Sequence, residues 1–183
     1  MANNRDGLVQ HTRQWFSRYG IETNATFIAG VSGGLDSMVL VETLHRVGVE
    51  VHVAHVNYHL RGEASDADQA LVEGWCAERG IPCDVLDAQV PSTEHGVQAE
   101  ARNIRYAHFE RLRSEARDRL GRTAYIVTAH HGDDQAETVL LHLMRSADPL
   151  ALAAMPAVDA ERELLRPFLT LDRKSTRLNS SHP

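Results

Sequence analysis

Short apolar runs alternate along the chain with longer segments in which apolar residues recur at helical spacing. The runs at 25–31 and 49–56 are rich in β-branched residues, as in strands that are buried on both faces of a parallel sheet. Runs at 83–88 and 123–129 have the same character, and 163–169 is a candidate fifth strand. We therefore expect a parallel sheet of about five strands.

In the segments between these strands, apolar residues recur every three or four positions, which is typical of helices. The predicted helices are a leading amphipathic helix at 8–19, one that runs to Val47, one that Ser65 caps and Gly80 ends, a long one at 97–120 and one that ends at Met144. Strands that alternate with helices in this way form βαβ units. The pattern predicts a doubly wound, Rossmann-like α/β fold with helices on both faces of the sheet.

Three polar signatures coincide with the ends of predicted strands. SGGLDS follows the first strand, HVNYHLRGE ends the second, and HHGDD follows the fourth. Ligands of doubly wound sheets bind outside the carboxyl ends of the strands. The three signatures are therefore expected to lie together around one site.

The first signature has the composition of a phosphate-binding turn. It comprises Ser32, Gly33, Gly34, Leu35, Asp36 and Ser37. The glycines let the backbone approach a ligand, and the helix that follows offers free N–H groups and the positive end of its dipole. Asp36 would repel a bare phosphate, so we expect it to hold Mg²⁺ or a substrate group. The motif lacks the GxxxxGK[ST] pattern of the Walker loop, and the alternative is a tight turn in which Asp36 caps the helix.

The third signature gathers acids and histidines in one short segment. Its candidate residues are His130, His131, Asp133, Asp134 and Glu137. Asp134 and Glu137 are three apart and share a helical face. The group could bind a divalent metal, orient a substrate nucleophile or stabilise a phosphate. The alternative is a helix start whose acids favour the dipole.

Two further sets of residues are candidates for ligand contact. Arg102 and Arg105 are three apart on the long helix, and paired guanidinium groups suit phosphate binding. A solvated charged helix is the alternative. His55 and His59 flank the loop after the second strand, where we expect contact with a nucleotide base or ribose.

Composition and charge narrow the function classes. With 43% hydrophobic and 24% charged residues, the chain is typical of a soluble globular protein. It has no apolar run of about 18 residues and no resemblance to a signal peptide, so we expect a cytoplasmic protein without a membrane partner.

Cys76 and Cys83 match no metal or redox spacing and are interpreted as reduced thiols. The net charge of −6 argues against binding nucleic acid through bulk charge alone.

Lysine is almost absent from the chain. Of the 19 basic residues 18 are arginine, and the single lysine is Lys174. Residues 174–183 also lack acids and are rich in Ser, Thr and Asn. We interpret this tail as a non-native end, and a natural disordered terminus is the alternative.

The motifs together resemble a known family. SGGLDS resembles the PP-loop of the N-type ATP pyrophosphatases. The segments VAHVNYHLRGEASDAD, VQAEARNIRY and VTAHHGDDQAETVLLHLMR, in this order, resemble one branch, the tRNA(Ile)-lysidine synthetases. The resemblance covers roughly residues 25–172, and it divides the chain into a leading helix at 1–24, a PP-loop ATP-binding catalytic domain at 25–173 and the tail.

The resemblance implies a two-step reaction. ATP activates the C2 oxygen of the wobble cytidine in tRNA(Ile) with a CAU anticodon, and pyrophosphate is released. The amine of free L-lysine then attacks C2 and expels AMP. SGGLDS would hold the pyrophosphate, Asp36 a Mg²⁺ ion, and Arg102 or Arg105 would lie near the α-phosphate. The acids and histidines of the third signature would bind the lysine ammonium group and deprotonate it.

The chain also departs from the family pattern. RSADP at 145–149 has no glycine where the family carries a glycine-containing turn. LRPFL at 165–169 and Arg173 resemble the next family segment, after which the likeness ends. Alternatives are another PP-loop adenylating enzyme such as a tRNA thiolase, a metal-dependent phosphohydrolase and a non-catalytic nucleotide-binding module. A homodimer is a possible assembly.

Overall fold

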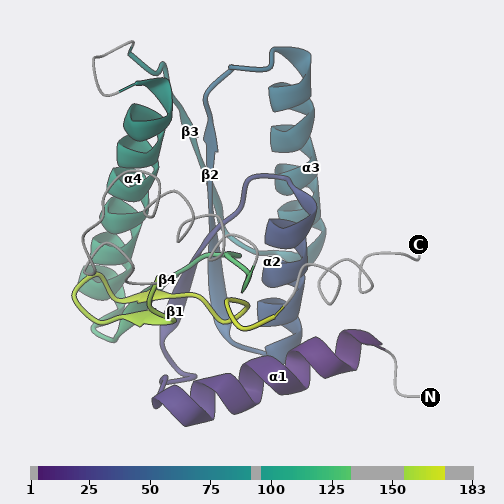
Figure 1. Ribbon diagram of the computed structural model, residues 1–183, viewed down its shortest axis with the longest axis vertical. Coiled ribbons are helices and arrows are strands. Elements are labelled where there is room, and N and C mark those ends of the chain that lie inside the picture. Colours follow the sequence, from purple (N-terminus) through teal and green to yellow (C-terminus); the bar gives the residue numbers. More distant parts are fainter. Residues whose placement is uncertain (1–3, 92–95, 133–154, 172–183) are drawn as a thin grey trace, which may run out of the picture.

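The computed structural model describes residues 4–91, 96–132 and 155–171, which form one sheet with flanking helices (Figure 1). The strands are β1 (Thr26–Gly30), β2 (Glu50–Asn57), β3 (Cys83–Asp87), β4 (Ala124–Val127), β5 (Val158–Asp159) and β6 (Leu164–Leu165). The helices are α1 (Asn4–Tyr19), α2 (Leu35–Val47), α3 (Glu63–Arg79) and α4 (Val97–Leu120). The strand order is β3-β2-β1-β4-β6-β5, and only β5 and β6 pair antiparallel. The predicted doubly wound α/β fold is confirmed.

The predicted elements agree with the structure except toward the C-terminal end. The long helix has the predicted bounds, and the first four strands lie within a few residues of their predicted positions. The candidate fifth strand is shorter than expected, because only Leu164 and Leu165 pair with β4 before Pro167 enters a turn. Strand β5 was not predicted, since two residues carry no periodicity. The helix expected to end at Met144 lies outside the described residues.

Helices cover both faces of the sheet. Helix α4 lies on one face, and α2 and α3 lie on the other, with α1 across the end of α2 (Figure 1). Strand β1 contributes to both interfaces, because Phe27 and Ala29 belong to the α1–α2 core whereas Ile28 belongs to the α4 core. All three are fully buried. This is the burial on both faces that the apolar run predicted.

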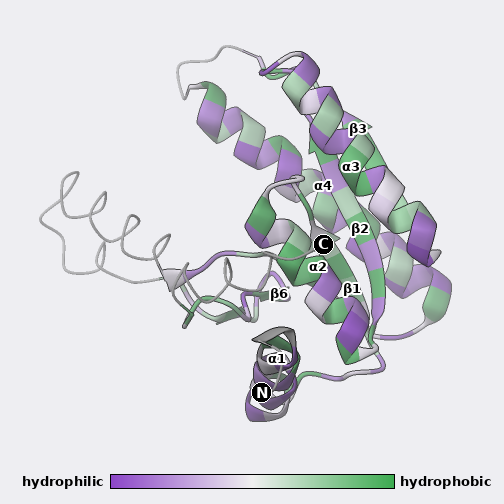
Figure 2. Ribbon diagram, turned by 90° about the vertical axis from the view of Figure 1, so that its right-hand side faces the viewer, coloured by the Kyte–Doolittle hydropathy of each residue, from purple (hydrophilic) through white to green (hydrophobic). Residues whose placement is uncertain are grey.

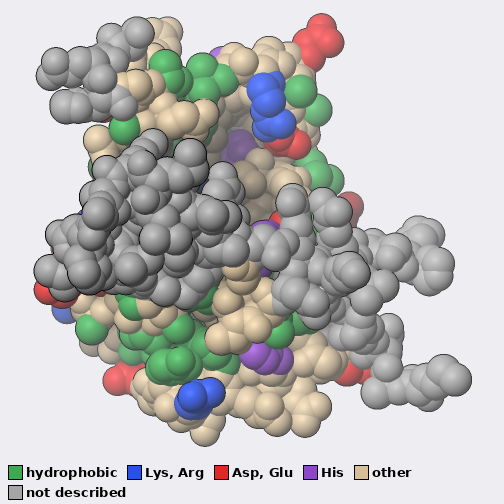
Figure 3. Space-filling model, in the orientation of Figure 1, with side chains coloured by type: hydrophobic (Ala, Val, Ile, Leu, Met, Phe, Trp, Pro, Cys, Tyr) green, Lys and Arg blue, Asp and Glu red, His purple; other side chains and the backbone are tan. Residues whose placement is uncertain are grey.

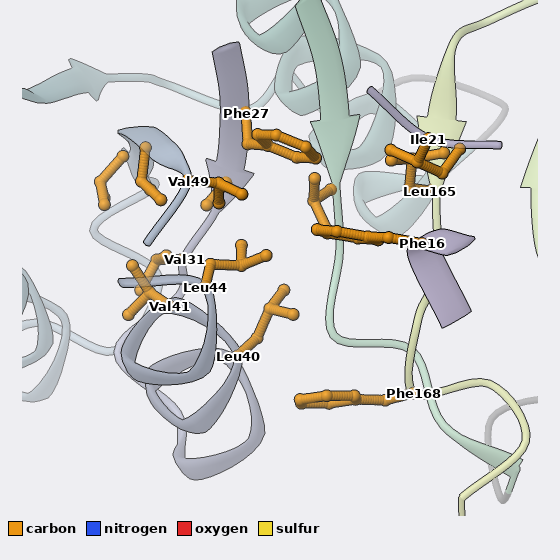
Figure 4. Close-up of a cluster of buried hydrophobic side chains, with 14 of the residues drawn as sticks. Phe16, Ile21, Phe27, Val31, Leu40, Val41, Leu44, Val49, Leu165 and Phe168 are labelled. Atoms are coloured by element: carbon orange, nitrogen blue, oxygen red, sulfur yellow. The ribbon is translucent and has the colours of Figure 1, made fainter. Parts of the chain in front are cut away.

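The larger core joins the leading helix to the sheet. Phe16 of α1 stacks on Phe27 of β1, with ring centroids 5.2 Å apart and an interplanar angle of 16°. Leu40 and Leu44 of α2 and Leu165 of β6 point into the same cluster (Figure 4). Helix α1 is therefore part of the core of the domain.

The smaller core lies beneath α4. Phe109, Leu112 and Ala116 recur at three- and four-residue spacing, and they pack on Ile28 and Ile126. Figure 2 shows the matching bands of hydrophobic and hydrophilic residues along this helix. The apolar stripe thus fixes the face that α4 turns to the sheet.

Helix α3 starts earlier than the sequence indicated. Ser65 was expected to cap it, but the helix begins at Glu63 after Gly62, which has φ 52° and ψ −130°. The Ser65 hydroxyl instead accepts a hydrogen bond from the Arg61 N–H at 3.2 Å. The prediction was wrong because Gly62 makes the turn without a side-chain cap.

Gly30 leaves room for the ring of Phe109. A Cβ atom at Gly30 would lie 2.5 Å from Phe109 Cζ and 2.7 Å from Cε2. We expect Gly30→Ala to lower the free energy of unfolding by about 1–3 kcal/mol through overpacking, measured by urea denaturation. Adding Phe109→Leu should recover part of this loss in a double-mutant cycle. Gly74→Ala is the matched control, because nothing lies within 4 Å of its added Cβ; an equal loss there would contradict this explanation.

His108 makes the stability of the fold sensitive to acid. Its imidazole is buried, with Nε2 3.5 Å from Asp84 Oδ1, and Arg111 Nη2 donates to Nδ1 at 3.3 Å. Burial lowers the pKa of His108 below its ordinary value; Asp84 opposes this shift and Arg111 adds to it. Burial also lowers the pKa of neighbouring His52.

A lowered pKa in the folded state means that the unfolded chain binds protons more readily. Stability should therefore be complete above the unfolded histidine pKa of about 6.5 and decrease as the pH falls below it. We expect His108→Gln to lose less stability than the wild type between about pH 7.5 and about pH 5, measured by thermal unfolding. His45→Gln, on the exposed side of α2, should keep the wild-type pH dependence. Parallel curves for His108→Gln and the wild type would show that His108 is not responsible.

Candidate functional site

A cavity of about 540 Å³ lies at the carboxyl ends of β1, β2 and β4. Residues of all three polar signatures line it: Ser32, Gly34, Asp36 and Ser37 from the first, His55, Asn57, Tyr58 and Arg61 from the second, and His130 and His131 from the third. Figure 3 shows a hollow on this face with histidine at its floor and a basic side chain beside an acidic one at its rim. The volume is within the range of small-molecule sites. The predicted convergence of the signatures is thus present.

The SGGLDS loop is held in shape by its own serines. Ser37 Oγ donates to the Gly34 carbonyl at 2.8 Å and accepts a hydrogen bond from the Ser32 N–H at 3.1 Å. Ser32 Oγ lies 3.2 Å from Ser37 Oγ and accepts from the Gly34 N–H at 3.3 Å. Gly34 is the N-cap of α2, so Asp36 lies in the first turn and does not cap the helix. Leu35, Asp36 and Ser37 of the first turn of α2 line the cavity, so the N-terminal end of this helix adjoins it, as an anion site requires.

Gly33 cannot be replaced by a residue with a side chain without local rearrangement. Its φ is +83°, and a Cβ atom would lie 2.7 Å from Asp68 Cβ on α3. The start of α3 therefore packs directly against the loop. Both the backbone conformation and the close approach require glycine here.

Asp36 and His131 bring the first and third signatures into contact. His131 Nε2 lies 3.5 Å from Asp36 Oδ2, and both side chains are largely buried. The neighbouring His130 Nδ1 is 2.8 Å from Thr128 Oγ1. A carboxylate next to an imidazole can hold a cation or transfer a proton to a bound group. The contact links two motifs whose expected roles were separate.

His55 presents a buried acceptor to the cavity. Its Nδ1–H donates to the Val31 carbonyl at 2.8 Å, which leaves Nε2 as the acceptor in the neutral ring. Within the described part of the chain, Nε2 has no hydrogen-bond partner. A ligand N–H or O–H group would relieve the free-energy cost of this buried atom. The residues present thus fit a polar ligand such as a nucleotide.

His59 does not line the cavity. Its ring lies between Asp66 Oδ1 at 3.3 Å and Asp87 Oδ1 at 3.0 Å, and its backbone is left-handed with φ 53°. The side chain of Asn57 accepts a hydrogen bond from the His59 N–H at 2.9 Å. Of the two histidines that flank this loop, the structure thus brings only His55 to the site.

The two arginines predicted on the long helix are separated. Arg105 lines the cavity, and its Nε donates to the Tyr58 hydroxyl at 3.3 Å, which in turn donates to the Ala101 carbonyl. Arg102 instead stacks over the Tyr106 ring, with Cζ 4.9 Å from the centroid, and is not among the lining residues. The geometry therefore favours Arg105 as the cation of this helix.

Other site predictions lie beyond the described residues. Asp133, Asp134 and Glu137 fall in the segment 133–154, as does the RSADP turn, and the tail is also outside. Among residues 4–91, 96–132 and 155–171, no group of three or more His, Cys, Asp or Glu side chains is arranged to hold a metal ion. Asp36 as a Mg²⁺ ligand stays a prediction.

No helix in these ranges is both long and apolar enough to cross a membrane.

Sequence reasoning did not single out two charged residues of the cavity. Arg61 and Asp68 both line the site and form an ion pair at 2.5 Å. Arg61 lies in the signature after the second strand, which was interpreted for its histidines, and its position near a strand end was the available signal. Asp68 lies within α3, where it reaches the cavity only because the helix packs against Gly33.

A sheet whose first strand leads through a Ser-Gly-Gly turn into a helix N-terminus defines an α/β domain suited to anionic ligands. The PP-loop domain family matches residues 8–179 of the chain. The chain belongs to this family.

Curated relatives point to one branch of the family. The chain is 38% identical over 160 residues to a tRNA(Ile)-lysidine synthase of Bacillus licheniformis, covering 81% of this chain and 32% of that protein. It is 36% identical over 176 residues to a tRNA(Ile)-lysidine synthase of Porphyromonas gingivalis, covering 88% of this chain and 37% of that protein. The chain thus spans about a third of the length of these relatives.

Solved structures share the fold. The U34-tRNA thiolase NcsA from Methanococcus maripaludis has a TM-score of 0.71 at 18% identity, over 96% of this chain and 61% of that one. The NH3-dependent NAD synthetase from Campylobacter jejuni has a TM-score of 0.61 at 13% identity, over 95% of this chain and 71% of that one. At these identities the likeness concerns the fold alone.

The packing of Gly33 against Asp68 can be tested directly. We expect Gly33→Ala to weaken ATP binding about tenfold or more, because the loop must shift to admit the methyl group. Isothermal titration calorimetry would measure the affinity. Gly20→Ala is the matched control, since Gly20 has a similar φ of +64° but nothing within 4 Å of its added Cβ. Equal losses of ATP affinity in both variants would refute the role of this contact.

Proposed function

We propose that this chain is the ATP-binding catalytic portion of a cytoplasmic tRNA(Ile)-lysidine synthase. The observation that carries the proposal is the convergence of SGGLDS, His55, Arg105 and the two histidines on one cavity. Similarity to tRNA(Ile)-lysidine synthases over 81–88% of the chain supports this choice within the PP-loop family. Its substrates would be ATP, free L-lysine and tRNA(Ile) with a CAU anticodon.

The chain's residues suit the first step, adenylation of the cytidine C2 oxygen. The α–β phosphate bond of ATP breaks, AMP is joined to the C2 oxygen, and pyrophosphate leaves. The amides of SGGLDS at the N-terminus of α2 would hold the departing pyrophosphate, since those of Ser32 and Gly34 donate within the loop. Arg105 would stabilise negative charge at the α-phosphate, with Arg102 as the sequence-based alternative. Mg²⁺, when held by Asp36, would offset charge on the leaving group.

In the second step a C–N bond forms between lysine and C2, and the C2–O bond to AMP breaks. The attacking amine must lose a proton, and an imidazole is suited to accept one near neutral pH. His130 and His131 are present at the cavity for this role. Asp133, Asp134 and Glu137 are proposed to bind the lysine ammonium group on sequence grounds.

The cysteines favour ligation over thiolation. Thiolases of this superfamily that modify cytidine usually carry paired cysteines near the site. Cys76 and Cys83 are both free, and neither lines the cavity. The hydrogen bond between the two thiols raises the pKa of Cys83, which burial raises further, and lowers the pKa of Cys76. Because both thiols lie away from the cavity, neither is placed to attack a substrate bound there.

The decisive assay supplies transcribed tRNA(Ile), ATP and Mg²⁺, with and without lysine. We expect pyrophosphate and AMP in equal amounts, with AMP release dependent on lysine. Because the net charge of −6 gives little general affinity for nucleic acid, tRNA should be used well above micromolar concentration. Orthophosphate release that needs no tRNA would instead support a phosphohydrolase. Nucleotide binding without turnover would support a non-catalytic module.

Asp36 should be needed for chemistry. We expect Asp36→Ala to abolish pyrophosphate release while the thermal unfolding curve stays close to that of the wild type, because the side chain is at the cavity and does not cap α2. Asp6→Ala is the control, since Asp6 pairs with Arg46 on the surface. Full activity of Asp36→Ala would disprove the assigned role.

A further inference from the structure

We propose that Arg61 binds the β- and γ-phosphates of the nucleotide, and that Asp68 is the counter-ion that holds Arg61 in the absence of nucleotide. The inference rests on the proposed ATP-dependent function and adds a phosphate-binding residue to it. It assigns a role to an ion pair that the reaction steps above do not use.

The position of the ion pair is the first argument. Asp68 packs against Gly33, where an added Cβ would lie 2.7 Å from Asp68 Cβ and 3.1 Å from its Cγ. Arg61 Nη2 donates to Asp68 Oδ2 at 2.5 Å. The guanidinium group is therefore next to the Ser-Gly-Gly turn, at the end of the cavity where pyrophosphate would be held.

The charge of the cavity is the second argument. Of the described residues that line it, only Arg61 and Arg105 carry a permanent positive charge, whereas Asp36 and Asp68 carry negative charge. Arg105 comes from α4 and is already bonded to the Tyr58 hydroxyl. A triphosphate next to two carboxylates needs further cations, and a planar guanidinium binds phosphate oxygens in pairs. Arg61 is the residue placed to supply this charge.

Hydrogen bonds hold the backbone of the loop that carries Arg61, whereas the side chain of Arg61 is largely exposed. The Arg61 N–H donates to Ser65 Oγ, and the Asn57 side chain holds the His59 N–H. The Arg61 side chain is 66% exposed, against 27% for Asp68. An ion pair as exposed as this contributes little stability. Exchange of the carboxylate for a phosphate is therefore inexpensive, and the backbone need not rearrange.

Calorimetric titration of the full chain with ATP, AMP and inorganic pyrophosphate tests this assignment. We expect Arg61→Ala to weaken ATP binding about 10- to 100-fold and AMP binding by less than about twofold, because AMP lacks the β- and γ-phosphates. Asp68→Asn keeps the shape of the side chain beside Gly33 and should bind ATP at least as tightly as the wild type, because a negative charge is removed. Arg46→Ala, which breaks the surface ion pair with Asp6, is the matched control.

Three results would overturn the assignment. ATP affinity of Arg61→Ala within about twofold of wild type would show that Arg61 does not contact phosphate. Equal weakening of ATP and AMP would indicate a general disturbance of the site. Weakening by Asp68→Asn as large as that by Arg61→Ala would show that the pair only fastens α3 to the loop. If the wild type binds no ATP, the proposed function fails, and the pyrophosphate titrations still decide whether Arg61 binds phosphate.

Discussion

The contact between Gly33 and Asp68 is the constraint on which the site depends. It brings the N-terminal half of α3 against the turn that follows β1, so this turn and the helix after β2 share one wall of the cavity. A side chain at Gly33 would separate them, and the ion pair of Asp68 with Arg61 would move with α3. The hydrogen bonds of Ser32 and Ser37 hold the shape of the turn, and the contact with Asp68 holds the turn against α3.

Much of the fold was predictable because burial on both faces leaves a simple sequence pattern. Strand β1 has no polar face, and its apolar run marked it without ambiguity. Helix α4 was predicted at its observed bounds because its apolar residues recur at helical spacing. Short strands such as β5 depend on the partner strand and leave no such pattern.

The site was predictable in its location and less so in its details. Topology alone places the carboxyl ends of parallel strands together, so SGGLDS, His55 and the histidine pair were expected to meet. The face that each side chain presents was harder to predict. Positions three apart on a helix differ by about 60° in direction, which is enough for Arg105 to reach the cavity while Arg102 stacks on Tyr106. The pairing of Asp36 with His131, and of Arg61 with Asp68, depends on distances that no local motif encodes.

The strand order has a consequence for biosynthesis. Strand β1 lies between β2 and β4, and Thr26 pairs with both Glu50 and Ala124. During synthesis on a ribosome, β1 can pair with β2 soon after both strands have emerged. The other edge of β1 can pair with β4 only after residues 124–127 have been made. During that interval an apolar strand has an unpaired edge, which is a template for association with other chains. The centre of the sheet, the most protected part of the finished molecule, is therefore the part most exposed to misassembly while the chain is incomplete.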